Sequence, residues 1–228
     1  MKITRFVNTS KAKSQKSAFV VDKRYGRGYN KSMNNRNYDK EMISVMQGVE
    51  KGAPLLLHSC CAPCSSACLE RLKDVFDITV LYYNPNIDDE KEYAKRKAEQ
   101  IRFLEQTGWA KILDCDHDKS AFEKMSRGLE NEPERGKRCY QCYALRLSFT
   151  AKTAKENGFA YFATTLTLSP HKNAVWLNEI GENVGGRYGL KYLVSDFKKQ
   201  GGYYRSIDLS KEYNLYRQDF CGCKYSKK

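Results

Sequence analysis

The sequence lacks long apolar runs. No part of its 228 residues approaches the roughly 18 to 20 consecutive apolar residues of a membrane-spanning helix, so we expect no membrane-embedded segment. Its basic first residues carry neither an apolar core nor a cleavage site, which argues against a secretory signal and for a cytoplasmic location. With 41% hydrophobic and 29% charged residues and no visible internal repeat, the composition is that of a globular protein.

Regular patterning is missing from the first part of the chain. Residues 1–50 are polar and show no sustained periodicity, apart from a short helix expected at 39–50. From Pro54 onward the pattern becomes regular. We therefore predict a partly irregular N-terminal extension over residues 1–50 and one folded domain over residues 51–228.

Cysteine, by contrast, is abundant. Four of the nine cysteines fall in "CCAPCSSAC", which begins at Cys60. In a chain without an export signal, such thiols indicate metal or redox use rather than structural disulfides. Within this motif, Cys68 follows Cys64 by about one helical turn, and we interpret it, like the isolated Cys115, as a bystander. The remaining cysteines form a C-x-x-C pair and a C-x-C pair, Cys139 with Cys142 and Cys221 with Cys223.

Short apolar strands alternate with amphipathic helices from Pro54 onward. The predicted strands are 54–59, 78–85, 110–116, 161–168 and 190–197, and the predicted helices are 65–75, 88–108, 138–158, 169–184 and 210–220. Ser169 is expected to cap the helix at 169–184, with Pro170 in its first position. This alternation predicts an α/β fold with a doubly wound, mainly parallel sheet, Rossmann-like or similar to that of nucleotide hydrolases.

The first cysteine motif directly follows the first predicted strand. It therefore lies at the carboxyl edge of the sheet, where open parallel sheets form their sites and where a helix N-terminus favours thiolate over thiol. Nucleotide-binding proteins of this type need a glycine-rich loop here so that backbone amides reach phosphate. Because cysteines stand in place of those glycines, we expect a metal or redox centre rather than ATP. His58, just before the motif, is interpreted as a packing residue and not as a ligand.

Two kinds of metal centre agree with the cysteine pattern. Cys61/Cys64 and Cys139/Cys142 could form a structural zinc site, but the two pairs lie much farther apart than in a zinc ribbon. Zinc would also leave Cys60 and the C-terminal pair without a role. Four thiolates from separate elements could equally hold an iron–sulfur cluster.

The "CGC" near the C-terminus has a different character. Gly222 permits the backbone angles that a very small ring needs, so Cys221 and Cys223 could form a strained and easily reduced disulfide. The alternative is that they are two further metal ligands.

Acidic residues are fewer than basic residues in this chain. The chain has 40 Lys and Arg against 27 Asp and Glu, a net charge of +13, and its 16 tyrosines are interleaved with the basic residues. A basic surface without a partner is one explanation. The other is RNA binding, in which basic side chains contact phosphates and rings stack on unpaired bases. Candidate contacts are Lys172, at a predicted helix start, and Arg205 and Arg217, among tyrosines.

A series of motifs carries a family resemblance. In order along the chain they are "HSCCAPCSS", "YYNPNI" followed by "EYAKR", "EPERGKRCYQCYALRL", "ATTLTLSPHKN", "DFKKQGGYYRSIDLSKE" and "LYRQDFCGC". Together they resemble the cobalamin-independent epoxyqueuosine reductases of the QueH type. The double cysteine, "RCYQC" and "LYRQDFCGC" make the resemblance specific. It extends from about Leu55 to Tyr225 and leaves the first 50 residues outside.

The resemblance implies an oxidoreductase of the last step of queuosine synthesis, which removes the epoxide oxygen of epoxyqueuosine at the wobble position of tRNA. It implies tRNA and an electron donor as partners. It also implies a catalytic iron–sulfur domain over 51–228, with a 4Fe–4S cluster held by Cys60, Cys61, Cys139 and Cys142. Cys221 and Cys223 would be the redox-active disulfide. Cys64 matches a position where some relatives have aspartate and where an additional iron has been associated with the site, so its role stays open.

The implied reaction consumes two electrons and needs a proton donor. A cluster passes single electrons, an iron ion can act as a Lewis acid, and two thiols that become a disulfide supply two electrons and two protons. The general-acid candidates are Asp116, His117, Tyr203 and Tyr204, and the sequence does not choose among them. Two other functions stay open here: a zinc-stabilised RNA-binding module, and an ATP-dependent tRNA-thiolating enzyme, against which the missing glycine-rich loop counts.

Overall fold

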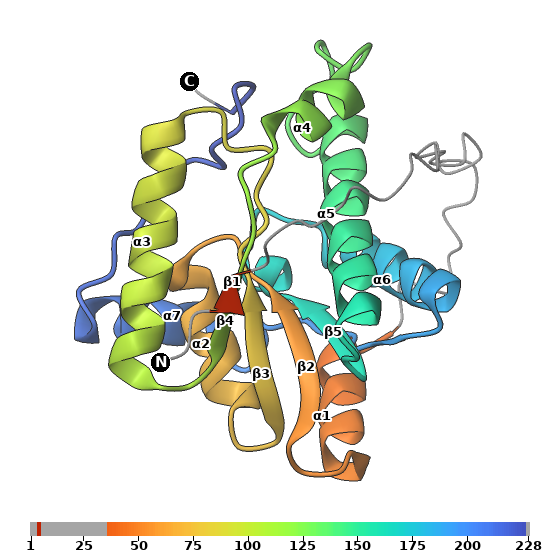
Figure 1. The fold of residues 1–228 in the computed structure, drawn as a ribbon, viewed down its shortest axis with the longest axis vertical. Helices are drawn as coiled ribbons and strands as arrows, with labels where there is room; N and C mark the ends of the chain where they lie inside the picture. The colour runs from red at the N-terminus through yellow and green to blue at the C-terminus, as the bar shows by residue number, and fades with distance from the viewer. Residues whose placement is uncertain (1–3, 6–35, 227–228) are drawn as a thin grey trace.

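The fold is built on a six-stranded parallel sheet (Figure 1). A computed structural model describes residues 4–5 and 36–226 of the chain. The strand order is β1-β4-β3-β2-β5-β6, and every neighbouring pair is parallel. The strands span Thr4–Arg5 (β1), Ala53–His58 (β2), Phe76–Leu81 (β3), Lys111–Asp114 (β4), Tyr161–Thr164 (β5) and Lys191–Tyr192 (β6). The doubly wound α/β fold predicted from the alternating pattern is confirmed.

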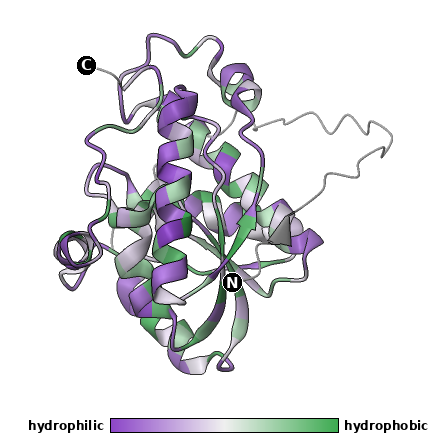
Figure 2. Cartoon of the chain, turned by 60° about the vertical axis from the view of Figure 1, so that its left-hand side comes forward, coloured by the Kyte–Doolittle hydropathy of each residue, from purple (hydrophilic) through white to green (hydrophobic). Residues whose placement is uncertain are grey.

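Helices cover both faces of the sheet. They are α1 (Tyr38–Gly48), α2 (Ala62–Leu72), α3 (Glu90–Thr107), α4 (Lys119–Ser126), α5 (Lys137–Glu156), α6 (Ala174–Tyr188) and α7 (Gly202–Glu212). Leu55 and Leu57 of β2 pack in the core formed with α2, α3 and α7, whereas Leu56 packs in the core formed with α5 and α6. Figure 2 shows the strands as mainly hydrophobic and the outer helix faces as mainly hydrophilic. Among the described residues, no helix has both the length and the apolarity needed to cross a membrane.

The strand order reverses between β2 and β5. From β2 the sheet continues through β3 and β4 to one side, and from β5 to β6 on the other. The carboxyl ends of β2 and β5 therefore open the crevice in which such sheets bind ligands. The chain leaving β2 enters α2 at Ala62, earlier than predicted, with Cys61 as N-cap and Pro63 in the first turn, where proline needs no N–H partner. Cys64 thus lies in the first turn of α2.

The segment after β5 differs from the prediction. A 3₁₀ helix (Thr165–Leu168) replaces the second half of the predicted strand. Ser169 does not cap α6, because its hydroxyl accepts a hydrogen bond from the N–H of His171 within a local turn. Asn173 is the N-cap instead, and its side chain accepts from the first turn of α6. Lys172 therefore precedes the helix and lies in the loop at the carboxyl edge of the sheet.

The helix predicted at 210–220 is wrong. α7 ends at Glu212, and Asn214 has a φ of 49°, in the left-handed region that does not continue a helix. The chain from Tyr213 to Ser226, the C-terminal segment, then has no helix and passes along α3. The cysteine pair is therefore well separated from α7 rather than following it on a short tail.

Other predicted elements differ less. β6 covers only Lys191–Tyr192 of the strand predicted at 190–197, and α4, capped by Asp118, has no counterpart in the prediction. Most of the extension predicted for residues 1–50 lies outside the described residues. Its described parts are β1, which pairs with β4, and the predicted short helix, present as α1.

Candidate active site

Three cysteine-bearing segments meet at the carboxyl edge of the sheet. They are the loop from β2 into α2, the first turns of α5, and the C-terminal segment. The larger of two adjoining cavities is lined by Cys60, Cys64 and Cys221, and the smaller by Cys139, Cys142, Cys221 and Cys223. Cys221 is part of both walls. The cysteine-rich site predicted at this edge is therefore confirmed.

The first group is a compact trio of thiols. The sulfurs of Cys60, Cys61 and Cys64 all lie within 4.8 Å of one another, and those of Cys60 and Cys61 are 3.7 Å apart. Among the described residues, no other set of three histidine, cysteine or carboxylate side chains brings its ligand atoms so close. The extended N-cap conformation of Cys61 produces this trio, because it places adjacent cysteines beside the first turn of α2.

The trio holds its charge on one sulfur. Hydrogen bonds from Cys61 and Cys64 lower the pKa of Cys60 well below its ordinary value; burial opposes this effect, and nearby Lys172 and Arg146 assist it. Burial and the neighbouring Cys60 raise the pKa of Cys61 to about 12, and hydrogen bonding to both neighbours raises that of Cys64. Within the trio, negative charge is therefore favoured on Cys60 over Cys61 and Cys64, and a bound metal would displace the protons that remain.

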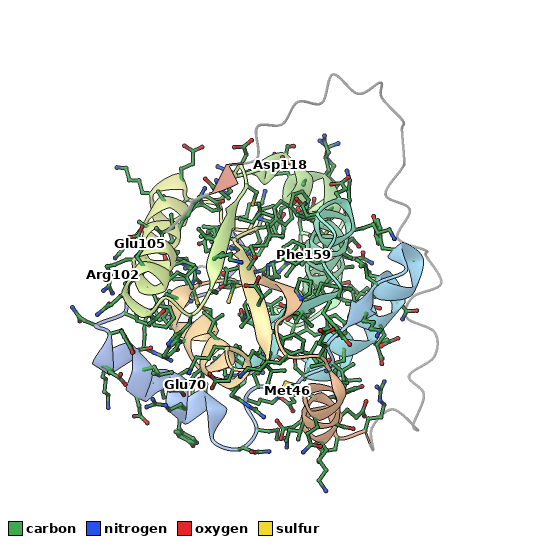
Figure 3. The ribbon with its side chains drawn as sticks, turned by 60° about the horizontal axis from the view of Figure 1, so that its bottom comes forward. Met46, Glu70, Arg102, Glu105, Asp118 and Phe159 are labelled. Carbon is green, nitrogen blue, oxygen red and sulfur yellow. The ribbon has the colours of Figure 1, made fainter. Side chains whose placement is uncertain are left out.

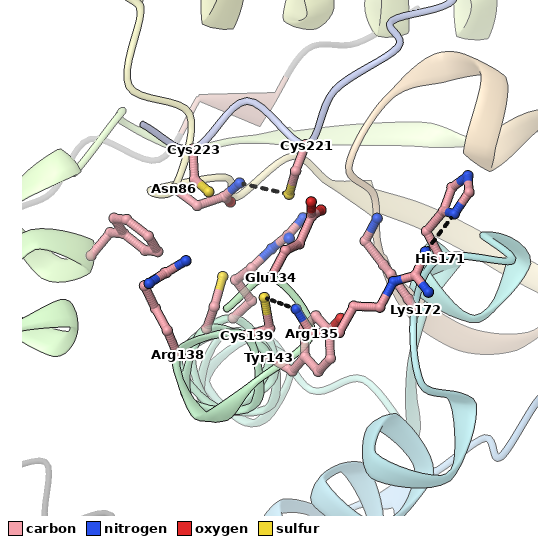
Figure 4. A pocket seen from close by; sticks show the side chains of 13 residues that line it. Asn86, Glu134, Arg135, Arg138, Cys139, Tyr143, His171, Lys172, Cys221 and Cys223 are labelled. Carbon is pink, nitrogen blue, oxygen red and sulfur yellow. Dashed lines mark hydrogen bonds between the residues drawn. The ribbon is translucent and has the colours of Figure 1, made fainter. Parts of the chain in front are cut away.

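The second group lies at the start of α5. The N–H of Arg135 donates to the sulfur of Cys139 at 3.2 Å, an approach made possible by a φ of 68° at Arg135. Cys142 lies one turn further into the helix, and burial raises its pKa to about 12. Figure 4 shows Cys139 facing the cysteines of the C-terminal segment across the smaller cavity.

The third group is the pair in the C-terminal segment. A hydrogen bond from Cys223 lowers the pKa of Cys221 to about 5 against the effect of burial, with help from Lys172 and Arg146. The same contact raises the pKa of Cys223. Cys221 is therefore a thiolate at neutral pH and Cys223 a thiol. This is the form in which a dithiol reacts, because the thiolate is the nucleophile.

Two cations, the buried Arg146 and the half-buried Lys172, face these sulfurs. Arg146 is only 1% exposed and donates to Nε2 of His58 at 3.2 Å and to Oδ1 of Asn84. Lys172 lines both cavities; burial opposes its charge, but the thiolates of Cys221 and Cys60 outweigh burial and raise its pKa. Within the described part of the chain, no carboxylate forms a salt bridge with either cation. Because unpaired buried charge is costly, these cations fit a site that holds negative charge, as several thiolates on a metal centre would.

Several residues singled out in the sequence lie elsewhere. His58 is fully buried and contacts Oγ1 of Thr164 at 2.9 Å and the carbonyl oxygen of Tyr83 at 3.0 Å, which agrees with the packing role expected for it. Of the bystander thiols, Cys68 donates to the carbonyl oxygen of Cys64, and Cys115 to that of Tyr82. Both are occupied by backbone contacts outside the cavities.

The candidate general acids and RNA contacts differ in whether they line the cavities. Of the four general-acid candidates, only Tyr203 lines the larger cavity, while Tyr204 is 73% exposed. His117 contacts the carbonyl oxygen of Ile87, and neither it nor Asp116 lines the cavities. Among the predicted RNA contacts, Lys172 and Arg217 line the larger cavity. Arg205 instead forms two hydrogen bonds with Glu70, at 2.9 and 2.6 Å.

Sequence reasoning missed some residues of the site. Arg146, Asn84 and Asn86 come from a helix interior and from the loop after β3, and only the three-dimensional fold brings them to the cysteines. Gln218 was also missed, although its amide lies 2.8 Å from the sulfur of Cys61. The one available signal was the position of "YYNPNI" at the end of the strand predicted at 78–85.

A thiol-lined cavity beside two cations, at the switch point of a doubly wound sheet, defines an α/β enzyme of metal or redox type. The comparison with known families specifies it further. Residues 55–228 match the family model described as "Epoxyqueuosine reductase QueH". The chain belongs to this family and is an oxidoreductase, which confirms the resemblance found in the sequence.

Individual relatives agree with the family match. The epoxyqueuosine reductase QueH of Staphylococcus epidermidis is 42% identical over 200 residues, covering 83% of this chain and 84% of the relative. That of Streptococcus pyogenes is 44% identical, covering 84% and 78%. The more distant protein of Thermotoga maritima is 33% identical over 175 residues, covering 75% and 89%. Neither the zinc-stabilised binding module nor the thiolating enzyme considered from the sequence is the activity named for these relatives.

Proposed function

We propose that this protein reduces the epoxide of epoxyqueuosine at the wobble position of tRNA to give queuosine. The observation that carries the proposal is the convergence of all three cysteine groups on two adjoining cavities at the sheet edge. Residues 51–228 would form the catalytic domain, since every cysteine lies there. A tRNA substrate also favours the cytoplasmic location expected from the sequence.

A 4Fe–4S cluster is the proposed cofactor, with Cys60, Cys61, Cys139 and Cys142 as ligands. Thiolates are the usual ligands of such clusters, and the charges of the buried Arg146 and the half-buried Lys172 would offset the negative charge of a thiolate-bound centre. Cys64 shares the trio with Cys60 and Cys61, so it is the natural extra ligand for an additional iron ion. When bound, the cluster would supply single-electron transfer.

The chain's own residues account for the rest of the reaction. The epoxide loses both carbon–oxygen bonds, a carbon–carbon double bond forms, and the oxygen leaves as water after taking up two protons and two electrons. Cys221 and Cys223 supply both electrons when they become a disulfide, but only one proton, because Cys221 is already a thiolate; a second donor must supply the other proton. Lys172, held cationic at the wall shared by both cavities, would stabilise the departing oxygen, and Tyr203 is the remaining candidate for proton delivery.

Recognition of tRNA is proposed at the larger cavity. Its volume of about 990 Å³ admits a nucleoside, because ligand pockets generally measure roughly 300 to 1,000 Å³. Lys172 and Arg217 line it, and the net charge of +13 favours a polyanion. After each turnover an electron donor must reduce the Cys221–Cys223 disulfide.

The test is anaerobic turnover with an anticodon stem–loop that carries epoxyqueuosine. We expect brown protein containing iron and sulfide, and conversion of the epoxide to the alkene once a reductant is present. Colourless protein with stoichiometric zinc and no turnover would contradict the proposal. Equal activity on the free nucleoside would contradict the assignment of tRNA as substrate.

A further inference from the structure

The C-terminal segment is held against α3 by arginines of that helix. Arg102 donates from Nη2 to the carbonyl oxygens of Tyr213 and Asn214, at 2.9 and 3.1 Å, and its guanidinium is oriented by Glu99. Figure 3 shows Arg102 on the side of α3 near α7. This contact fixes the segment where it leaves α7.

Arg96 likewise binds two backbone carbonyls of the segment and pairs with a glutamate, but next to Cys221 and Cys223. It donates from Nη2 to the carbonyl oxygen of Phe220 and from Nη1 to that of Cys221, both at 3.3 Å, while Glu92 accepts from its Nε at 2.6 Å. The guanidinium also lies over the ring of Phe220, 4.9 Å from its centroid. The side chain of Arg96 is 3% exposed, against 44% for Arg102, so this second contact is shielded from water.

Gly222 completes the attachment. Its φ is 96°, and a Cβ here would lie 3.1 Å from Cγ1 of Ile87 and 3.3 Å from Nη1 of Arg96. Its carbonyl oxygen accepts from the N–H of Asp88 at 3.0 Å. Three consecutive carbonyls, from Phe220 to Gly222, are therefore bound by α3 and the loop before it.

The sulfur of Cys221 depends on this backbone support. Outside the pair, this sulfur accepts a hydrogen bond from the side-chain amide of Asn86 at 3.9 Å, which is a weak contact. The carbonyls held by Arg96 belong to the two peptide groups on either side of the Cys221 α-carbon. Fixing both groups fixes the direction of the Cα–Cβ bond, and with it the distance from the sulfur to Lys172.

We propose that Arg96 is the positioning residue of the Cys221–Cys223 dithiol. This inference rests on the proposed function, in which that pair delivers electrons to the epoxide. The planar guanidinium binds two adjacent carbonyls at once, which the single ammonium group of lysine does not reproduce. Arg96 is part of the wall of the larger cavity, but its hydrogen bonds go to Glu92 and to two backbone carbonyls, so it acts on the sulfur of Cys221 through the backbone.

Arg102 provides a matched control, because it lies on the same helix, pairs with a glutamate and binds two carbonyls of the same segment. The experiment compares Arg96→Gln, Arg96→Lys and Arg102→Gln in the cluster-loaded protein. It measures single-turnover rate, KM for the stem–loop, thermal unfolding, and the pH profile of Cys221 alkylation by iodoacetamide, followed by peptide mass spectrometry. Arg96→Lys retains the charge beside Glu92, so it stays informative if Arg96→Gln unfolds.

We expect both Arg96 variants to lose roughly 10- to 100-fold in rate with KM little changed, as for misplaced reacting groups. The alkylation profile of Cys221 should move toward that of an ordinary thiol, because the sulfur leaves its cationic surroundings. Arg102→Gln should lower only the unfolding temperature. Equal rates and alkylation profiles in Arg96→Lys and Arg102→Gln would overturn the inference. An inactive wild-type protein would instead overturn the proposed function.

Discussion

The side-chain amide of Gln218 lies 2.8 Å from the sulfur of Cys61, so the C-terminal segment contacts the first cysteine group as well as carrying the third. Hydrogen bonds to ligand sulfurs stabilise the more negative, reduced state of an iron–sulfur centre. Gln218→Leu should therefore lower the midpoint potential by about 40 mV, which corresponds to one hydrogen bond of about 1 kcal/mol. A redox titration followed by electron paramagnetic resonance measures this. Gln106→Leu on the surface of α3 should leave the potential unchanged.

Serine substitution tests the cluster ligands. Changing any one of Cys60, Cys61, Cys139 and Cys142 to Ser should greatly lower iron and sulfide content, because a soft thiolate is lost. Cys115→Ser is the control and should retain the cluster, since that thiol donates to the carbonyl oxygen of Tyr82. The measurement is iron and sulfide analysis with the visible spectrum. Four serine variants with full chromophores would show that the ligands lie elsewhere.

Substitution of Cys221 and Cys223 should affect turnover without affecting the iron content. The double variant Cys221→Ser/Cys223→Ser should keep its iron, because the proposed ligands come from the loop between β2 and α2 and from α5. Multiple turnover should be lost with the two-electron exchange. Anaerobic thiol counting should show about two reducible thiols in the oxidised wild type and none in the double variant. Joint loss of iron and activity would instead make these cysteines metal ligands.

Because the imidazole of His58 is buried, we expect the free energy of unfolding to depend on pH. Burial, followed by the charge of Arg146, lowers its pKa to about 3, so the native ring stays neutral while the unfolded ring takes up a proton below about pH 6.5. The unfolded state thus binds more protons, and the free energy of unfolding should fall by about 1.6 kcal/mol from pH 6.5 to pH 5. Urea unfolding measures it. His58→Gln should remove this part of the slope, while the exposed His171→Gln should retain it.

Binding of tRNA should weaken steeply with added salt, because contacts to phosphate release counterions. Arg217→Ala should reduce the logarithmic salt slope by about 0.7, the contribution of one contact to a single strand. Arg205→Ala should have a smaller effect, because Arg205 is already paired with Glu70. Fluorescence anisotropy over a salt series provides the measurement. An affinity that does not depend on salt would exclude the basic surface from recognition.

The fold could be predicted because β2, α3 and α5 carry strong local patterns. The sheet edge that holds the site could then be predicted too, since the first cysteines come just after β2. The C-terminal segment could not be predicted in this way. "SKEYNLYRQDF" resembles a helix, but α3 offers arginines to its backbone carbonyls, and these tertiary bonds replace the intrahelical ones. Arg146 could not be predicted either, because only tertiary contacts bury it: nothing in the local sequence distinguishes a buried arginine in α5 from a surface one.

Cys221 forms part of the wall of both cavities, so the proposed dithiol adjoins two different surroundings. A nucleoside in the larger cavity would meet this thiol from one side. The smaller cavity, of about 40 Å³, admits little more than water and is lined by Cys139 and Cys142, which are proposed to hold the cluster. Electrons would therefore return to the pair through the cluster, and the proposed disulfide could be reduced while the product still occupies the larger cavity.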